Sequence, residues 1–130
     1  GERGPTKVTV AALRVRRERW PSRYRRMFEQ IGALAGEGTK AIELGDLEAL
    51  GDAMNVNHGL LSALQLSSPD LDLMVHRLRS LGALGAKLTG AGGDGGAVLG
   101  LFLEPEPAAA RLSREGVRCF VSQIAGPREL

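Results

Sequence analysis

The chain is organised around the stretch GAKLTGAGGDGGAVLGLF, residues 85–102. A short apolar run, residues 83–88, precedes the glycine-rich part of this stretch, and a second apolar run, residues 97–103, follows it. Apolar runs of this length bounded by glycine are typical of buried strands. The sequence therefore predicts two strands joined by a loop, residues 90–95, that consists almost entirely of glycine and alanine.

The composition of this loop indicates a ligand. Glycine accepts positive φ and lets backbone N–H groups approach a ligand without an intervening Cβ. Successive N–H groups turned inward make an anion-binding concavity that suits phosphate. A plain hairpin connection is the alternative, but it needs only one or two glycines at its turn. We therefore predict that the loop lines a phosphate-bearing active site, through Gly90, Ala91, Gly92, Gly93, Asp94 and Gly95.

Asp94 is the unusual residue of the loop, because an anion beside phosphates is repulsive unless a cation intervenes. Asp also satisfies backbone N–H groups in turns, and we favour that structural role. Neither dinucleotide nor Walker spacing fits the glycines, since no Gly-Lys-Ser/Thr follows and a strand, not a helix, is expected next.

Composition limits the possible classes of protein. A chain of 130 residues with 43% hydrophobic residues is long enough for one domain with a real core. The net charge of +2 gives no general argument for nucleic acid. No stretch reaches the roughly 18 apolar residues that a membrane span needs. The single cysteine, Cys119, is expected to be a buried thiol of a cytoplasmic protein, and no Cys/His cluster predicts a metal site.

Hydrophobic periodicity and capping residues predict several helices before the glycine loop and a helix and a strand after it. The first expected helix covers residues 7–19. Ser22 is expected to cap a second helix, which Gly36 and Gly38 kink or break and which ends at Gly45. A third helix follows Asp46, a fourth runs from Ser68 to Gly82, a fifth covers 108–115, and a last strand covers 118–124. This pattern favours an α+β class, with an antiparallel sheet and helices packed on one face.

Seven arginines lie between Arg14 and Arg26, together with Trp20 and Tyr24. A nucleic-acid patch is one interpretation of such a cluster. We favour a solvated basic face, because Glu18 and Glu29 interrupt the cluster and the helical stripes leave most of these charges toward solvent.

Three ordered blocks of the sequence resemble one known family. Residues 82–93, GALGAKLTGAGG, resemble the third conserved motif of the GHMP kinases, in the form seen in mevalonate kinases. Upstream, GDAMNVNHGLL (51–61) and LQLSSPDLD (64–72) resemble the stretch that precedes this motif. GPTK (4–7) is similar to the segment where the first strand of the family's C-terminal domain ends. Asp94 departs from the pattern, because the family generally has glycine there.

The resemblance implies that residues 1–130 form one domain, the ferredoxin-like C-terminal domain of a GHMP kinase. It implies transfer of the γ-phosphoryl group of ATP to a small alcohol, for which mevalonate is the expected substrate, with Mg²⁺. In the family, the phosphate-binding loop and the aspartate and lysine that act at the hydroxyl belong to an N-terminal domain, which this chain lacks. The expected partners are therefore that domain, ATP and the alcohol, and the sequence leaves open whether the protein forms a homodimer. We expect no catalytic residue in this chain, and neither turnover nor tight ATP binding by the chain alone.

Five residues outside the loop are candidates for positions near the substrate: Thr6, Asn57, His58, Lys87 and Thr89. Asn55, Asn57 and His58 share a helix lined with leucines, and a structural role is the alternative for them, since a histidine inside such a helix is more often a hydrogen-bonded core residue. Lys87 points either to the site or to solvent, and strand periodicity alone leaves both open. Two other functions remain open: a GHMP kinase for phosphomevalonate, homoserine or a sugar, and a non-catalytic helical binding module.

Overall fold

The computed structural model describes residues 3–89 and 96–124, with side chains from residue 11 onward. Five helices and two strands make up these parts of the chain. They are α1 (Arg3–Arg19), α2 (Pro21–Leu44), α3 (Leu47–Ala63), α4 (Pro69–Ser80), β1 (Gly85–Thr89), β2 (Ala97–Leu101) and α5 (Pro105–Arg114). The predicted α+β class is confirmed, with helices packed against an antiparallel pair of strands.

Local chemistry sets the ends of several helices as predicted. Asp46 caps α3, because its side chain accepts a hydrogen bond from the N–H of Ala49. Ser68 caps α4 in the same way through the N–H of Leu71, and Pro69 occupies the first turn. Gly45 ends α2 in the left-handed region with φ of 71°, which costs glycine little.

Two predictions about α2 are wrong. Ser22 is not its cap: the helix begins at Pro21, Trp20 holds the cap position, and no side chain makes a capping hydrogen bond. Gly36 and Gly38 do not break it either, because α2 is continuous to Leu44. A glycine inside a helix costs about 1 kcal/mol relative to alanine. The packing of buried side chains before and after these glycines outweighs that cost.

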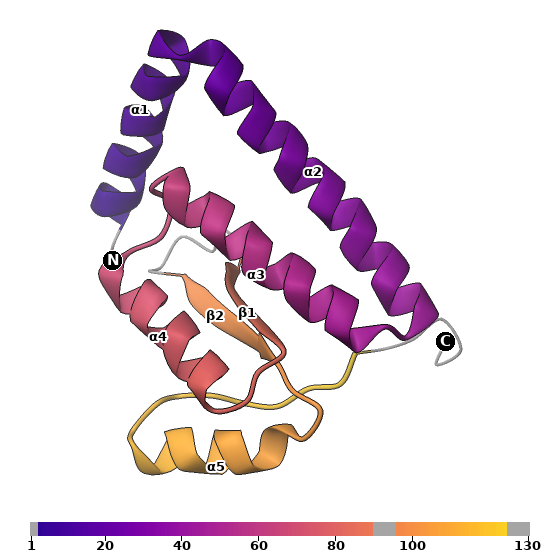
Figure 1. Cartoon of the computed structure of the whole chain (residues 1–130). Helices are drawn as coiled ribbons and strands as arrows, with labels where there is room; N and C mark the ends of the chain where they lie inside the picture. The colour runs from indigo at the N-terminus through magenta and orange to yellow at the C-terminus, as the bar shows by residue number, and fades with distance from the viewer. Residues whose placement is uncertain (1–2, 90–95, 125–130) are drawn as a thin grey trace.

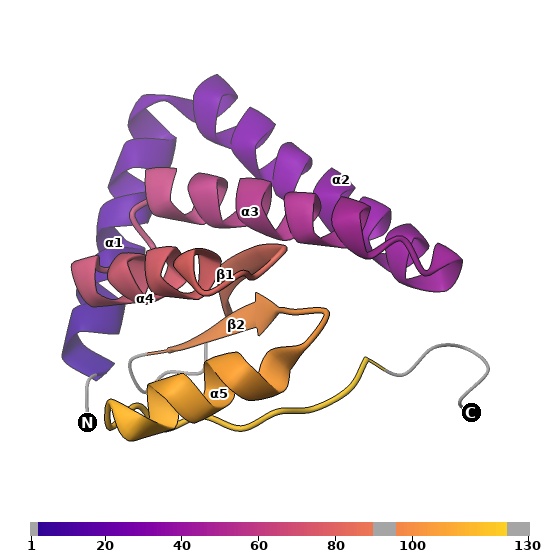
Figure 2. The ribbon, with the colours of Figure 1, turned by 60° about the horizontal axis from the view of Figure 1, so that its bottom comes forward.

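The two strands form an antiparallel hairpin in which Gly85 pairs with Leu101 and Thr89 pairs with Ala97. α2 and α3 run alongside one another, and the strands lie beneath α3 (Figures 1 and 2). A Cβ at Gly51 of α3 would lie 2.5 Å from the carbonyl oxygen of Leu84. The backbones of α3 and β1 therefore approach one another without side chains between them.

Two apolar clusters form the core of the described residues. The first joins α2, α3 and β2 through Ala41, Leu50, Met54 and Leu101. The second joins α4, β1 and α5 through Val75, Leu78, Ala86 and Leu112. The hairpin is thus packed between both clusters, and its position is fixed by helices on each of them.

The prediction of a last strand over residues 118–124 is wrong. These residues have no regular secondary structure and are exposed, and Phe120 is 91% exposed. A strand needs a neighbour to pair its backbone, and in the described ranges the sheet holds only β1 and β2. Cys119, predicted to be buried in that strand, is also exposed, and its Sγ lies 3.6 Å from the carbonyl oxygen of Ala109.

No helix in the described part of the chain has the length and apolar character that crossing a membrane requires.

Candidate functional site

The ends of the hairpin fix where the glycine-rich segment begins and ends. Thr89 and Ala97 are paired, so residues 90–96 connect adjacent strand ends. The predicted loop residues, Gly90, Ala91, Gly92, Gly93, Asp94 and Gly95, lie outside the described residues. Gly96, the first residue described after them, has φ of 75° and lies close to Leu71, in the first turn of α4. Gly96 therefore precedes β2 beside the start of α4.

In the part of the chain that the structure describes, side chains of α3 and not a further strand pair the backbone of β1 on the side away from β2. The N–H of Ala86 donates to Oδ1 of Asn55 (3.0 Å), and Nδ2 of Asn55 donates to the carbonyl of Leu84 (3.3 Å). Two residues further along the strand, the N–H of Leu88 donates to Nδ1 of His58 (3.1 Å). Residues three apart on a helix share a face, as do alternate positions along one edge of a strand, so the two periodicities meet here.

Each of these two α3 side chains is held in turn by α4. Nε of Arg79 donates to Oδ1 of Asn55 at 2.9 Å, which fixes the orientation of the amide. Nε2 of His58 lies 2.8 Å from Oδ1 of Asp72. We call these four side chains, together with Ser67, the edge clamp of β1.

The edge clamp fixes the tautomer of His58. The Leu88 N–H donates to Nδ1, so Nδ1 carries no proton, and the ring proton of the neutral imidazole lies on Nε2. Nε2–H therefore donates to Asp72. The His58 side chain is only 7% exposed and both of its nitrogens are engaged. This arrangement favours the structural role of His58 over contact with a substrate.

Ser67, His58 and Asp72 do not form a nucleophilic triad, although the residue types are those of one. The hydroxyl of Ser67 donates to Oδ1 of Asp72 (2.8 Å) and not to His58. A serine nucleophile requires a base that accepts its proton, and here the only basic nitrogen accepts a backbone N–H. The three side chains orient one another and leave no group free for acid–base chemistry.

The hydrogen bond from Ser67 lowers the pKa of Asp72 below its ordinary 3.8, with smaller contributions from His58 and His76, while partial burial opposes the shift. A carboxyl whose pKa is lower in the folded state stabilises the fold above its unfolded pKa, and the stabilisation is lost as pH falls through the folded value.

We therefore predict that Asp72→Asn destabilises the chain at pH 7 by less than about 1 kcal/mol, because the half-exposed carboxylate is screened. The difference between wild type and variant shrinks once the pH falls below 3.8. Urea unfolding of both proteins at pH 7 and pH 3 measures it. An equal difference at both pH values contradicts the charged role of Asp72.

Lys87 and Thr89 lie on the same face of β1 as Gly85, since side chains alternate along a strand. Lys87 is half-buried, and its Nζ donates to the carbonyl of Leu88 at 2.7 Å. Burial lowers the pKa of Lys87 from 10.5. Thr89 is the last described residue before the glycine-rich segment. Both predicted residues are therefore at the segment's base.

Asn57 and Thr6 are less closely placed. Asn57 lies in α3, and its Oδ1 is buried without a hydrogen-bond partner among the described atoms. Thr6 lies within helix α1 and not, as predicted, at the end of a strand. The structure thus brings His58, Lys87 and Thr89 together around β1.

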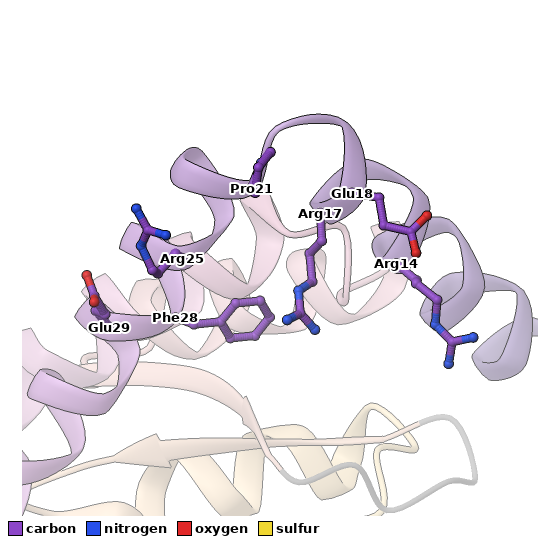
Figure 3. A pocket seen from close by; sticks show the side chains of 7 residues that line it. All are labelled: Arg14, Arg17, Glu18, Pro21, Arg25, Phe28 and Glu29. Atoms are coloured by element: carbon purple, nitrogen blue, oxygen red, sulfur yellow. The ribbon is translucent and has the colours of Figure 1, made fainter.

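A separate groove of about 880 Å³ lies at the corner between α1 and α2. Figure 3 shows the guanidinium of Arg17 beside the ring of Phe28, with Arg14 and Arg25 farther along the walls. Glu18 and Glu29 also line the groove, so its charge is mixed. Arg16 turns away from solvent instead, donating to the hydroxyl of Tyr24 and to the carbonyl of Leu64. The arginine cluster is therefore partly structural.

Sequence reasoning missed three residues of the edge clamp: Ser67, Asp72 and Arg79. Ser67 and Asp72 stand in the 64–72 block without a role of their own, and Arg79 is not singled out. Their partners are on α3, so no local spacing marks them. A polar residue at a buried helix position, as at His58, was the available signal that partners were needed.

Comparison with known proteins places the chain in a family. The family model described as GHMP kinases C terminal matches residues 39–120. The chain belongs to the GHMP kinase family, and the matched part is the family's C-terminal region. The similar proteins are mevalonate kinases, which confirms the predicted resemblance.

The mevalonate kinase of Aeropyrum pernix is 58% identical over 80 residues, which cover 62% of this chain and 24% of that protein. The mevalonate kinase of Pyrococcus horikoshii is 38% identical over 136 residues, which cover 91% of this chain and 40% of that protein. The crystal structure of L. major mevalonate kinase in complex with R-mevalonate superposes with a TM-score of 0.72 at 30% identity, covering 83% of this chain and 33% of that one. The chain thus spans well under half the length of the relatives it matches.

Proposed function

We propose that the chain is the C-terminal part of an ATP-dependent kinase that transfers the γ-phosphoryl group of ATP to the hydroxyl of mevalonate. The observation that carries this proposal is the similarity to mevalonate kinases across 91% of the chain, including the strand–glycine–strand unit. The kinship to kinases also argues against a non-catalytic binding module, for which the mixed charge of the α1–α2 groove gives little support.

The glycine-rich segment has the residue types that this chemistry needs. Phosphoryl transfer depends on positioning and on neutralising the charge of the transferring group. Backbone N–H groups of residues 90–95 are proposed to face the phosphates, because glycine permits their close approach. Lys87 and Thr89, at the base of the segment, are proposed to lie near the substrate. The ammonium of Lys87 has to exchange its bond to the Leu88 carbonyl for any contact with an anion.

ATP and Mg²⁺ are proposed to be held mainly by an N-terminal domain that precedes this region. Mg²⁺ prefers carboxylate and phosphate oxygens. Within residues 11–89 and 96–124, no three His, Cys, Asp or Glu side chains gather in a group that suits a metal ion. We therefore assign no metal ligand to the described residues and expect the phosphates themselves to bring the cation.

The substrate is tested in the complete polypeptide that carries this chain. ADP formation is measured with mevalonate, phosphomevalonate, homoserine and galactose at equal concentrations. We expect kcat/KM for mevalonate to exceed the others by at least about 100-fold, since a site built to pair a substrate's polar groups rejects analogues strongly. A higher kcat/KM with another alcohol assigns the chain to a different GHMP kinase, and no ADP formation with any alcohol contradicts the proposal.

A further inference from the structure

The two halves of the edge clamp hold different parts of β1. Asn55, supported by Arg79, pairs backbone groups of Leu84 and Ala86 at the start of the strand. His58, supported by Asp72, pairs Leu88 near its end. Only Thr89 separates Leu88 from the first residue of the glycine-rich segment.

The hydrogen bond from the Leu88 N–H to His58 is well placed to fix the position of the end of β1. Leu88 is only 9% exposed and Ala86 is fully buried, so this part of β1 is enclosed. A buried N–H without a partner costs free energy, so the strand end follows the position of Nδ1. Nδ1 is in turn oriented by the Asp72 bond at Nε2, and Asp72 by Ser67. The ring has no freedom to rotate without breaking both of its bonds.

We propose that His58, oriented by Asp72 and Ser67, is a positioning residue that fixes the end of β1 at Leu88 and Thr89, next to the start of the glycine-rich segment. The inference rests on the proposed kinase function, because it concerns how that segment meets the phosphates. His58 touches no reactant; it acts through the backbone of Leu88. A displacement of about 1 Å at a reacting group is enough to lower a rate by about 100-fold.

The experiment uses the complete polypeptide and compares four variants with wild type. His58→Leu removes the acceptor for the Leu88 N–H, His58→Asn keeps an amide oxygen near the position of Nδ1, and Asp72→Asn keeps the shape of the support. Leu112→Ala is the control, since it destabilises the second apolar cluster without touching the clamp. For each protein, kcat and KM for mevalonate and ATP are measured together with the thermal midpoint.

We expect His58→Leu to lower kcat about 10- to 100-fold with KM changed less than about threefold. His58→Asn recovers at least a fifth of the wild-type kcat, and Asp72→Asn lies between the two. Leu112→Ala keeps kcat within about twofold even with an equal or larger loss of thermal midpoint. Equal kcat losses in His58→Leu and Leu112→Ala, or no loss in either His58 variant, overturn the proposal.

Hydrogen exchange at the Leu88 amide gives a second readout that needs no substrate. We expect exchange in His58→Leu to be at least about tenfold faster than its loss of global stability accounts for, because the amide loses its acceptor. In Leu112→Ala the exchange rises no more than the loss of global stability accounts for. If His58→Leu does not fold, His58→Asn and Asp72→Asn are compared in the same way. A wild-type protein that fails to phosphorylate mevalonate refutes the proposed function alone. An unchanged Leu88 exchange rate in every clamp variant refutes the positioning role.

Discussion

Replacing Gly51 with alanine is expected to destabilise the chain by about 3 kcal/mol or more, while the same change at Gly59 on the same helix stabilises it. A Cβ at Gly51 would lie 2.5 Å from the carbonyl oxygen and 2.7 Å from the carbonyl carbon of Leu84. Real Cβ atoms do not approach backbone so closely, so α3 must move away from β1. That movement pulls Asn55 and His58 away from the strand as well.

Gly59 supplies the matched control. It lies two turns along α3, is exposed, and has no atom within 4 Å of an added Cβ. Alanine at Gly59 is expected to raise the free energy of unfolding by about 0.5–1 kcal/mol, because alanine has a higher helix propensity than glycine. Gly51→Ala has the same gain in helix propensity, so the difference between the variants measures the clash.

Thermal unfolding of the two variants and wild type is the measurement. For a chain of this size about 3 kcal/mol corresponds to a fall of roughly 10 °C in Tm. A Gly51→Ala protein as stable as Gly59→Ala would contradict the direct backbone approach of α3 and β1.

Elements whose ends depend on neighbouring residues could be predicted from the sequence. Asp46, Ser68 and Gly45 each satisfy or terminate a helix end with their own side chain or backbone conformation. The hairpin followed from apolar runs on either side of glycine, and its register places Thr89 opposite Ala97. In these cases the interacting residues are close in the sequence, so the local sequence pattern predicts the interaction.

Features that depend on distant partners could not be predicted in the same way. The alternation over residues 118–124 fits a strand, but strand formation requires a neighbouring edge, which alternation cannot specify. The partner of His58 is Asp72, fourteen positions away on another helix. Periodicity placed His58 on a buried face and predicted that it needs hydrogen bonds. Only the packing of α3 against α4 determines which carboxylate provides one.

The proposed role of the glycine-rich segment predicts the largest effect on activity. Replacing Gly92 and Gly93 together with valine adds branched side chains where backbone N–H groups are proposed to face phosphate. Valine also resists positive φ. Preorganised N–H donors at a transferring charge are worth about 100- to 1,000-fold in kcat each. We expect kcat/KM of the complete kinase to fall by at least about 100-fold.

The same chemical change at Gly32 and Gly36 provides the control. Both are exposed on α2, with nothing within 4 Å of an added Cβ, and valine is no worse than glycine inside a helix. This double variant is expected to keep kcat/KM within about twofold of wild type.

The most direct test of the account is therefore mevalonate-dependent ADP formation by the complete polypeptide, measured for wild type, Gly92→Val/Gly93→Val and Gly32→Val/Gly36→Val at matched fold stability. We expect the first double variant to lose at least about 99% of kcat/KM and the second to keep it. Wild-type turnover by a folded Gly92→Val/Gly93→Val protein would contradict the claim that the backbone of this segment meets the phosphates.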